Sequence, residues 1–192
     1  METQIESIIQ ASIDLKSKVL NDQEIIKTVM EVVDSIVLCY KNGGKVLFCG
    51  NGGSAADAQH LAAELSGRFY FDRPPLFAEA LHVNSSYITA VANDYGYDEV
   101  FARLVNAMGK QGDILIGLTT SGNSPNILKA FKAANLLKMK TVGFTGESGG
   151  QLKTESNFLL NVPSKDTPRI QETHIMLGHI ICELVEEKLF KA

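Results

Sequence analysis

Hydrophobic side chains recur every three or four residues in two stretches at the start of the chain. They are Ile5, Ile8, Ile9, Ile13, Leu15 and Val19 in the first stretch, and Ile25, Ile26, Val29, Val33, Ile36, Val37 and Tyr40 in the second. This spacing predicts two amphipathic helices. Asn21-Asp22 separates them and Asn42-Gly43-Gly44 ends the second. Their apolar faces either cover the core or pack against another subunit.

Short apolar runs follow, bounded by Gly, Pro, Asn or Ser. They predict five strands, at residues 46–49, 76–83, 114–118, 141–145 and 158–162. The segments between them have helical patterns, and from Arg169 to about Phe190 one long helix is apolar on several sides and must be largely buried. Strands alternating with helices predict an α/β fold with a parallel sheet and helices on both faces.

The first predicted strand leads into a glycine-rich break, Gly50-Asn51-Gly52-Gly53, and then into a helix. Ser54 is a good N-cap candidate, and the residues after it are mostly strong helix formers. A strand, a glycine turn and a helix start present free backbone N–H groups to an anion. A tight turn without a ligand is the alternative interpretation.

A second segment repeats this form after the third strand. The loop Thr119-Thr120-Ser121-Gly122-Asn123-Ser124 is rich in hydroxyl groups, and Pro125 suits the first position of the next helix. Its side-chain and backbone donors match a phosphate monoester. Open parallel sheets bind ligands at the carboxyl ends of their strands, where both loops lie.

Ligand-capable side chains occur on two of the predicted helices. His60 and Glu64 are four residues apart and share a face, and Gln171 and His179 lie on one slanted row of the last helix. Together they form a plausible four-ligand site for a divalent metal, zinc above all. Without a metal, Glu64 and His179 remain a carboxylate and an imidazole suited to acid–base catalysis. His174 lies off that row and is interpreted as structural or surface-exposed.

Bulk properties narrow the class of protein. A length of 192 residues fits one domain, or one domain with an added helical piece. The net charge of −4 argues against a broad nucleic-acid surface, and no apolar run is long enough to span a membrane. Three cysteines lie far apart in apolar segments, as expected of buried side chains in a reducing compartment: Cys39, Cys49 and Cys182. With no secretory signal pattern, a cytoplasmic location is expected.

Several separated motifs agree in order and spacing with a known family. The segments CGNGGSAADAQHLAAELSGRF, Asn93-Asp94, TTSGNSPN and RIQETHIMLGHI resemble the sugar isomerase (SIS) domain family, and within it the phosphoheptose isomerases, over essentially the whole chain. The resemblance implies one flavodoxin-like SIS domain over 1–192, with a helical pair at 1–42 and a five-stranded α/β sandwich at 43–192. It implies a homotetramer with active sites between subunits and one zinc ion per subunit.

The same resemblance implies an activity and a set of site residues. The activity is conversion of sedoheptulose 7-phosphate to D-glycero-D-manno-heptose 7-phosphate through a cis-enediol, the first step toward heptose for bacterial lipopolysaccharide or capsule. The implied zinc ligands are His60, Glu64, Gln171 and His179, with Glu64 and His179 as the acid/base pair. The implied substrate-binding residues are Asn51, Gly52, Gly53, Glu64, Asn93, Asp94, Gln171 and, around the phosphate, Thr119, Thr120, Ser121 and Ser124. Some relatives carry an acidic residue where this chain has Pro168, and Asp166 lies two residues earlier.

Other functions remain open at this point. The main alternative is a non-catalytic SIS protein that binds a bacterial replication initiator, although such relatives lack the carboxylate and imidazole found here at Glu64 and His179. A sugar-phosphate-sensing regulator would need a DNA-binding domain. An isomerase for another ketose phosphate differs only in the shape of its pocket.

Overall fold

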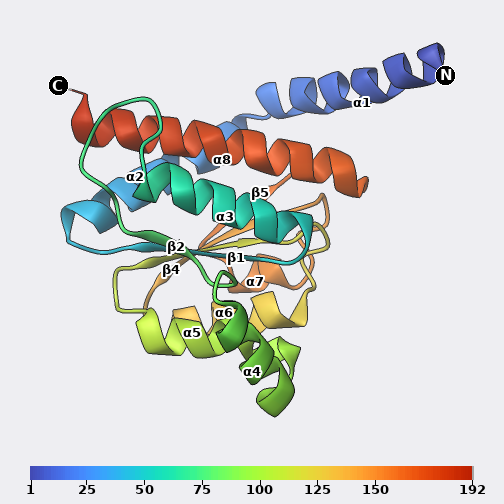
Figure 1. The fold of residues 1–192 in the computed structure, drawn as a ribbon. Coiled ribbons are helices and arrows are strands. Elements are labelled where there is room, and N and C mark those ends of the chain that lie inside the picture. Colours follow the sequence, from blue (N-terminus) through green and yellow to red (C-terminus); the bar gives the residue numbers. More distant parts are fainter. Residues whose placement is uncertain (192) are drawn as a thin grey trace.

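A five-stranded parallel sheet lies between two layers of helices in the computed structural model, which describes residues 1–191 (Figure 1). The strand order is β2-β1-β3-β4-β5, and every neighbouring pair is parallel. The strands are β1 (Val46–Gly50), β2 (Ala78–Ala80), β3 (Ile114–Leu118), β4 (Lys140–Thr145) and β5 (Phe158–Asn161). This arrangement confirms the predicted doubly covered parallel sheet.

The helices divide between the two faces of the sheet (Figure 1). Helices α2, α3 and α8 cover one face, and α4, α5, α6 and α7 lie on the other. Their bounds are α1 (Glu2–Leu20), α2 (Gln23–Lys41), α3 (Gly53–Ser66), α4 (Ser85–Tyr95), α5 (Val100–Met108), α6 (Pro125–Leu136), α7 (Leu152–Glu155) and α8 (Thr167–Phe190), with a 3₁₀ turn at Tyr97–Glu99.

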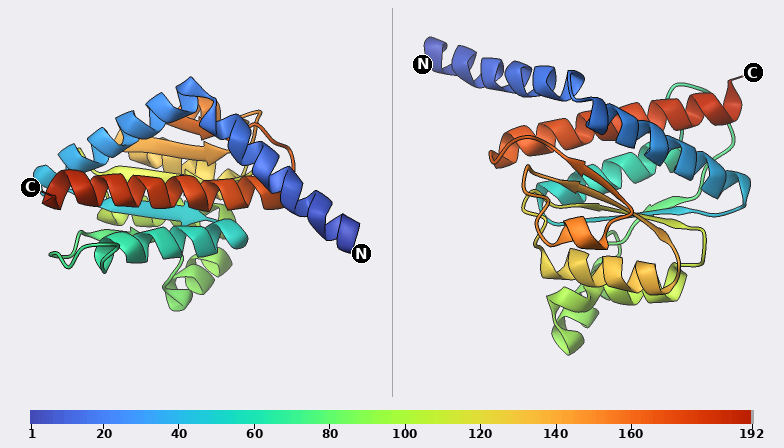
Figure 2. Two further views of the ribbon diagram at one scale, coloured as in Figure 1. Left: turned by 90° about the horizontal axis from the view of Figure 1, so that it is seen from above. Right: turned by 180° about the vertical axis from the view of Figure 1, so that it is seen from behind.

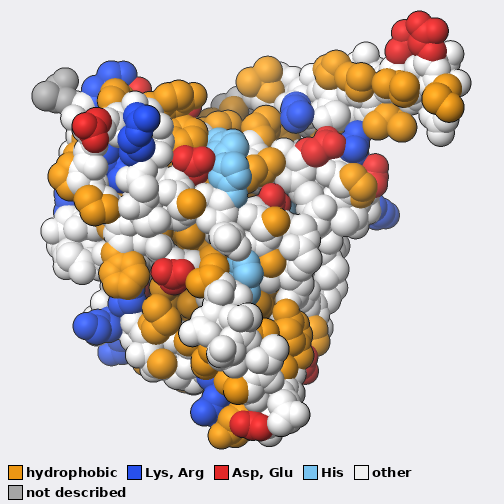
Figure 3. Space-filling model, viewed as in Figure 1, with side chains coloured by type: hydrophobic (Ala, Val, Ile, Leu, Met, Phe, Trp, Pro, Cys, Tyr) orange, Lys and Arg blue, Asp and Glu red, His pale blue; other side chains and the backbone are white. Residues whose placement is uncertain are grey.

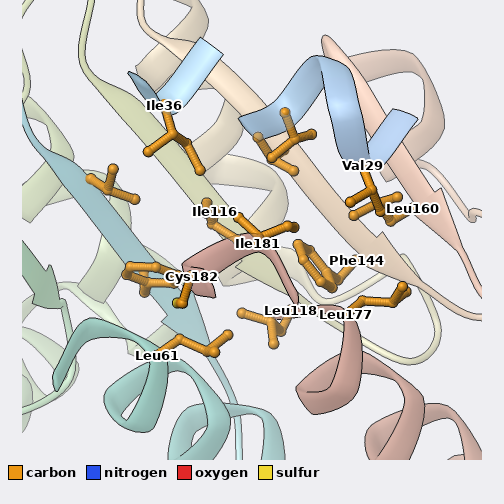
Figure 4. Close-up of a cluster of buried hydrophobic side chains, with 14 of the residues drawn as sticks. Val29, Ile36, Leu61, Ile116, Leu118, Phe144, Leu160, Leu177, Ile181 and Cys182 are labelled. Atoms are coloured by element: carbon orange, nitrogen blue, oxygen red, sulfur yellow. The ribbon is translucent and has the colours of Figure 1, made fainter. Parts of the chain in front are cut away.

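Strand side chains alternate between two hydrophobic cores, because successive residues of a strand point to opposite faces. Phe48 packs in the core under α2, α3 and α8, whereas its neighbour Leu47 packs in the core against α5 and α6. Figure 4 shows the first of these cores, where Leu61 of α3 and Cys182 of α8 lie against the sheet. The continuous burial of β1 and β3 matches a strand covered on both faces.

The two N-terminal helices differ in how much of their surface packs against the core. Helix α2 packs its apolar side into the core and is capped by Asp22, whose side chain accepts hydrogen bonds from the backbone N–H groups of Glu24 and Ile25. Helix α1 projects from the body of the molecule (Figure 2) and buries only Leu15 and Val19. Its isoleucines, at positions 5, 8, 9 and 13, are exposed.

Some predicted boundaries were wrong. Ser54 is not the N-cap of α3, because the helix already begins at Gly53 and Ser54 is buried inside it. The second strand is only Ala78–Ala80, since the chain pairs with β1 for just three residues. The last helix, α8, begins at Thr167 rather than at Arg169, and so takes in Pro168. The short helix α7 was not predicted.

Two expectations from composition also have structural counterparts. Cys39, Cys49 and Cys182 are free and buried, as predicted. Among the helices of residues 1–191, none is long and apolar enough to cross a membrane.

Candidate active site

His60, Glu64 and His179 meet where α3 and α8 pack side by side. His60 Nε2 lies 3.0 Å from Glu64 Oε1 and 3.1 Å from His179 Nε2. The two helices run in the same direction, since Gly53 neighbours Gln171 and Leu61 neighbours Gly178. Figure 3 shows histidine beside acidic side chains on the upper part of the molecule, where these helices lie. The sequence therefore correctly predicted that these three side chains converge.

The donor atoms of this triad suit a divalent metal. One ligand atom from each of His60, Glu64 and His179 lies within 4.8 Å of the other two. Two imidazoles and one carboxylate, with a position left for water or substrate, are a common ligand set of catalytic zinc. An open hollow of about 440 Å³ beside the triad is lined by Ala56, Gln59, His60, Ala63 and Glu64. The triad therefore fits a metal ion that has three protein ligands and an open position for a molecule bound in the hollow.

Asp57 is a carboxylate near the triad that the sequence reasoning missed. It lies three residues before His60, on the same side of α3. Its Oδ2 atom is buried without a hydrogen-bond partner. Burial raises the pKa of Asp57, while the neighbouring His60 and His179 oppose that rise. The i, i+3 spacing of Asp57 and His60 was the signal available in the sequence.

The first loop lies at the start of α3. Gly52 has φ +56°, a conformation that glycine adopts without steric cost. A side chain at Gly53 would meet the Gln171 amide, since a Cβ there would lie 2.8 Å from Gln171 Nε2. Gly53 precedes His60 by seven residues, about 10 Å along a helix axis. Within one chain, the structure thus places Gln171 beside the loop, apart from the other three predicted zinc ligands.

The second loop follows β3 and carries a hydroxyl network. Thr119 Oγ1 lies 2.9 Å from Ser124 Oγ and 3.4 Å from Ser121 Oγ. Ser124 precedes α6 at its N-cap position but makes no side-chain cap bond. A pocket of about 360 Å³ opens beside this loop and is lined by Thr120, Ser121, Asn123, Glu147, Ser148, Ser164, Lys165, Thr167 and Ile170. The pocket offers hydroxyl groups to a phosphate, and the cation among these lining residues, Lys165, is paired with the Glu147 carboxylate at 3.1 Å.

A pair of amide side chains joins the two loops. Asn51 Nδ2 donates to Asn126 Oδ1 at 2.9 Å, and Asn126 Nδ2 donates back to Asn51 Oδ1 at 2.8 Å. Asn126 is only 2% exposed and also accepts a bond from the backbone N–H of Ile127. The sequence did not single out Asn126, because only the fold brings the starts of α3 and α6 together.

Asn93 and Asp94 stand apart from the triad in a single chain. Both are exposed in α4, in the layer on the other face of the sheet from α3 and α8 (Figure 1). Asn93 Nδ2 donates a 2.9 Å hydrogen bond to Asp94 Oδ1. Asp166 precedes α8 at its N-cap position, is exposed and makes no side-chain cap bond. The chain alone thus assembles the triad and the two loops.

Comparisons with known proteins show the family to which the chain belongs. The family model for the SIS domain matches residues 9–146. The chain is 52% identical over 190 residues to the phosphoheptose isomerase of Clostridium acetobutylicum, covering 99% of this chain and 97% of that protein. It is 53% identical over 185 residues to the phosphoheptose isomerase of Mycobacterium tuberculosis, covering 96% and 94%.

A solved structure shows the same fold. The phosphoheptose isomerase of Neisseria gonorrhoeae superposes with a TM-score of 0.91 at 40% identity, over 97% of this chain and 98% of that one. The fold is thus shared over nearly the full length. The chain belongs to the SIS-domain family and, within it, to the phosphoheptose isomerases.

Proposed function

We propose that the protein interconverts sedoheptulose 7-phosphate and D-glycero-D-manno-heptose 7-phosphate, the first step of heptose synthesis for bacterial surface glycans. The observation that carries this proposal is the triad of His60, Glu64 and His179 in a chain that shares half of its residues with phosphoheptose isomerases. A ketose–aldose isomerase needs proton-transferring groups at the sugar carbons and oxygens, and anion-binding groups at the phosphate. The triad supplies the first, and the loops after β1 and β3 supply the second.

Glu64 and His179 are assigned the two proton transfers. The reaction removes a proton from C1, forms a cis-enediol and returns the proton to C2, while a proton moves from O1 to O2. We assign the carbon-bound proton to the Glu64 carboxylate and the oxygen-bound proton to His179, since general acid–base groups of these types act within hydrogen-bond reach. The second imidazole, His60, lies against both and holds their ring and carboxylate in place.

We further propose that the triad holds one zinc ion. His60 Nε2, His179 Nε2 and Glu64 Oε1 are the atoms that lie closest together in the triad, and zinc, when bound, would supply a Lewis acid that polarises the sugar carbonyl. Gln171 completes the predicted ligand set only if its amide leaves Gly53. In the present geometry, it supports a second role at the loop, as a substrate contact with Asn51, Gly52 and Gly53.

The phosphate is assigned to the loop after β3. Thr119, Thr120, Ser121 and Ser124 bring hydroxyl groups to the start of α6, where the helix dipole favours an anion. Asn93 and Asp94 belong to the proposed substrate site only in an assembly where another subunit brings them to the triad.

We propose that the working form is a homotetramer with active sites between subunits, and that the protein acts in the cytoplasm. The exposed isoleucine row of α1 supports the first proposal, because an isolated chain gains nothing from it. The free, buried cysteines support the second. In this proposal, the helical pair 1–42 and the α/β part 43–192 act as one unit.

An isomerase assay with sedoheptulose 7-phosphate tests the proposal. Turnover that falls after dialysis against a chelator and returns with added zinc is expected. Glu64→Gln should lower kcat by about 10² to 10⁴ with a smaller change in KM, since the amide cannot take up a proton. Near-full activity of this variant would remove Glu64 as the base. No turnover under any condition would favour the non-catalytic alternative, a protein that binds a replication initiator.

A further inference from the structure

Residues 67–77 connect α3 to β2 without regular structure, yet they are tied to α8 by one buried carboxylate. Glu186 of α8 accepts hydrogen bonds from the backbone N–H groups of Phe69, Tyr70 and Phe71 at 3.1, 2.6 and 3.1 Å. It also accepts a 2.8 Å bond from Arg73 Nε. The side chains of Arg73 and Glu186 are 1% and 0% exposed. This ion pair is therefore part of the interior.

The remaining nitrogens of Arg73 bind the end of α3. Nη2 donates to the carbonyl of Glu64 at 2.9 Å, and Nη1 donates to the carbonyls of Leu65 and Gly67 at 2.9 and 3.1 Å. The last carbonyls of a helix have no partner within the helix, and a cation there also interacts favourably with the negative end of the helix dipole. Arg73 thus fixes the turn of α3 that carries Glu64.

Glu186 is also linked to His179, because it binds the backbone of Phe69, whose ring contacts His179. The Phe69 ring packs against the His179 ring with centroids 5.7 Å apart, while its backbone N–H is held by Glu186. His179 and Glu186 are seven residues apart, two turns along one face of α8. The ion pair therefore contacts the backbone of one triad residue and the ring neighbour of another.

We infer that Arg73 and Glu186 are positioning residues that set the distance between Glu64 and His179, and with it the metal affinity and the proton transfers of the site. This inference rests on the proposed function for its catalytic part, but the effect on the triad is a property of the chain alone. Residues that orient metal ligands from outside the ligand set change metal affinity by 10- to 100-fold when substituted.

A purely structural ion pair would lower stability and nothing else, so the test needs a matched control. The chain offers one just before the central strand, β3. Asp113, before β3, is buried, pairs with the buried Lys45 and accepts hydrogen bonds from the backbone N–H groups of Lys45 and Lys110. Asp113→Asn removes the same kind of charge as Glu186→Gln, but the hydrogen-bond partners of Asp113 are Lys45 and Lys110 rather than α3 or residues 69–73.

The experiment measures zinc binding by chelator competition, melting temperature, and kcat and KM for the wild type, Glu186→Gln, Arg73→Lys and Asp113→Asn. Arg73→Lys keeps a cation but loses the planar fork whose three nitrogens bind Glu186 and the carbonyls at the end of α3. We expect Glu186→Gln and Arg73→Lys to weaken zinc binding at least tenfold and to lower kcat more than they raise KM. Asp113→Asn should lower only the melting temperature.

Two outcomes overturn the inference. One is a zinc affinity within twofold of wild type in both Arg73→Lys and Glu186→Gln. The other is an equal loss of affinity in Asp113→Asn. If Glu186→Gln does not fold, Arg73→Lys decides. If the wild type binds no zinc, the imidazole ¹⁵N chemical shifts of His60 and His179 decide, and unchanged shifts in both variants refute the inference. A wild type that binds zinc but has no turnover refutes the proposed function alone.

Discussion

His174 and His179 lie five residues apart in α8, and their surroundings give them opposite roles. His179 belongs to the triad, where its ring meets His60. His174 is fully buried, and its Nε2 donates to the carbonyl of Thr145 at 3.1 Å. Its Nδ1 has no partner, so a proton there would be an unsatisfied buried charge. Burial lowers the pKa of His174 from 6.5 to about 4, against a smaller opposing effect of the Thr145 hydrogen bond.

This histidine predicts a pH dependence of stability. Between pH 6.5 and 4 only the unfolded chain takes up the proton, so the free energy of unfolding falls as the pH falls through that range. The loss amounts to about 3 kcal/mol in total. Urea denaturation at pH 7, 6 and 5 should show a steeper decline in wild type than in His174→Gln, whose amide keeps the bond to Thr145. Equal slopes would contradict the assignment.

The amide pair of Asn51 and Asn126 predicts a binding effect. Asn126→Ala leaves the Asn51 amide without its partner and frees the first loop to move. We expect KM for the sugar phosphate to rise several-fold, and the free energy of unfolding to fall by about 1 to 3 kcal/mol. Asn106→Ala, at an exposed position in α5, is the control that should change neither. A raised KM in both variants would refute the specific role of the pair.

At the scale of elements, the contact between α3 and α8 depends on one glycine. A Cβ at Gly178 would lie 2.5 Å from Leu61 Cδ1 and 2.6 Å from Leu61 Cδ2, and Leu61 is itself only 1% exposed. The close approach at this point brings His60 of α3 within hydrogen-bond distance of His179 of α8. A larger residue at position 178 therefore forces either the buried Leu61 side chain out of its place or the two helices apart.

Gly178→Ala should therefore be harmful despite the better helix propensity of alanine. We expect a net loss of about 1 to 3 kcal/mol in the free energy of unfolding, together with weaker zinc binding. In the Leu61→Ala background the same substitution should cost less, because the space is then free. A double-mutant cycle by thermal denaturation measures this coupling, expected at about 0.5 to 3 kcal/mol. Strict additivity would show that the clash does not limit the packing.

The elements whose local pattern agrees with the fold were predictable from the sequence. The helices α1, α2 and α8, the strand β3 and the convergence of His60, Glu64 and His179 all follow from spacing. The short β2 did not, because Leu76 and Val83 extend its apolar pattern beyond the residues that pair with β1. Asn126 and the Arg73–Glu186 pair were missed for another reason. Their roles arise from contacts over 75 and 113 positions, which a local pattern does not encode.

At the scale of the whole molecule, α1 is the part least explained by a single chain. Its exposed isoleucines form an apolar row along the projecting helix (Figure 3), continuous with an apolar groove of about 520 Å³ between α1, α2 and α8. Ile9 is 54% exposed in that row. Ile9→Lys should yield a smaller assembly than wild type by light scattering after gel filtration. Leu136→Lys, at a more exposed leucine of α6, should leave the assembly unchanged.

The position of α8 in the chain has a consequence for folding during translation. It follows every element that it packs against, including α1, α2 and α3, and it carries both His179 and Glu186. During translation, the apolar face that α2, α3 and the sheet present to α8 therefore stays uncovered until α8 itself has left the ribosome. Nascent chains that stop earlier expose that face and lack His179, so they are substrates for chaperones and proteases rather than partly active enzymes.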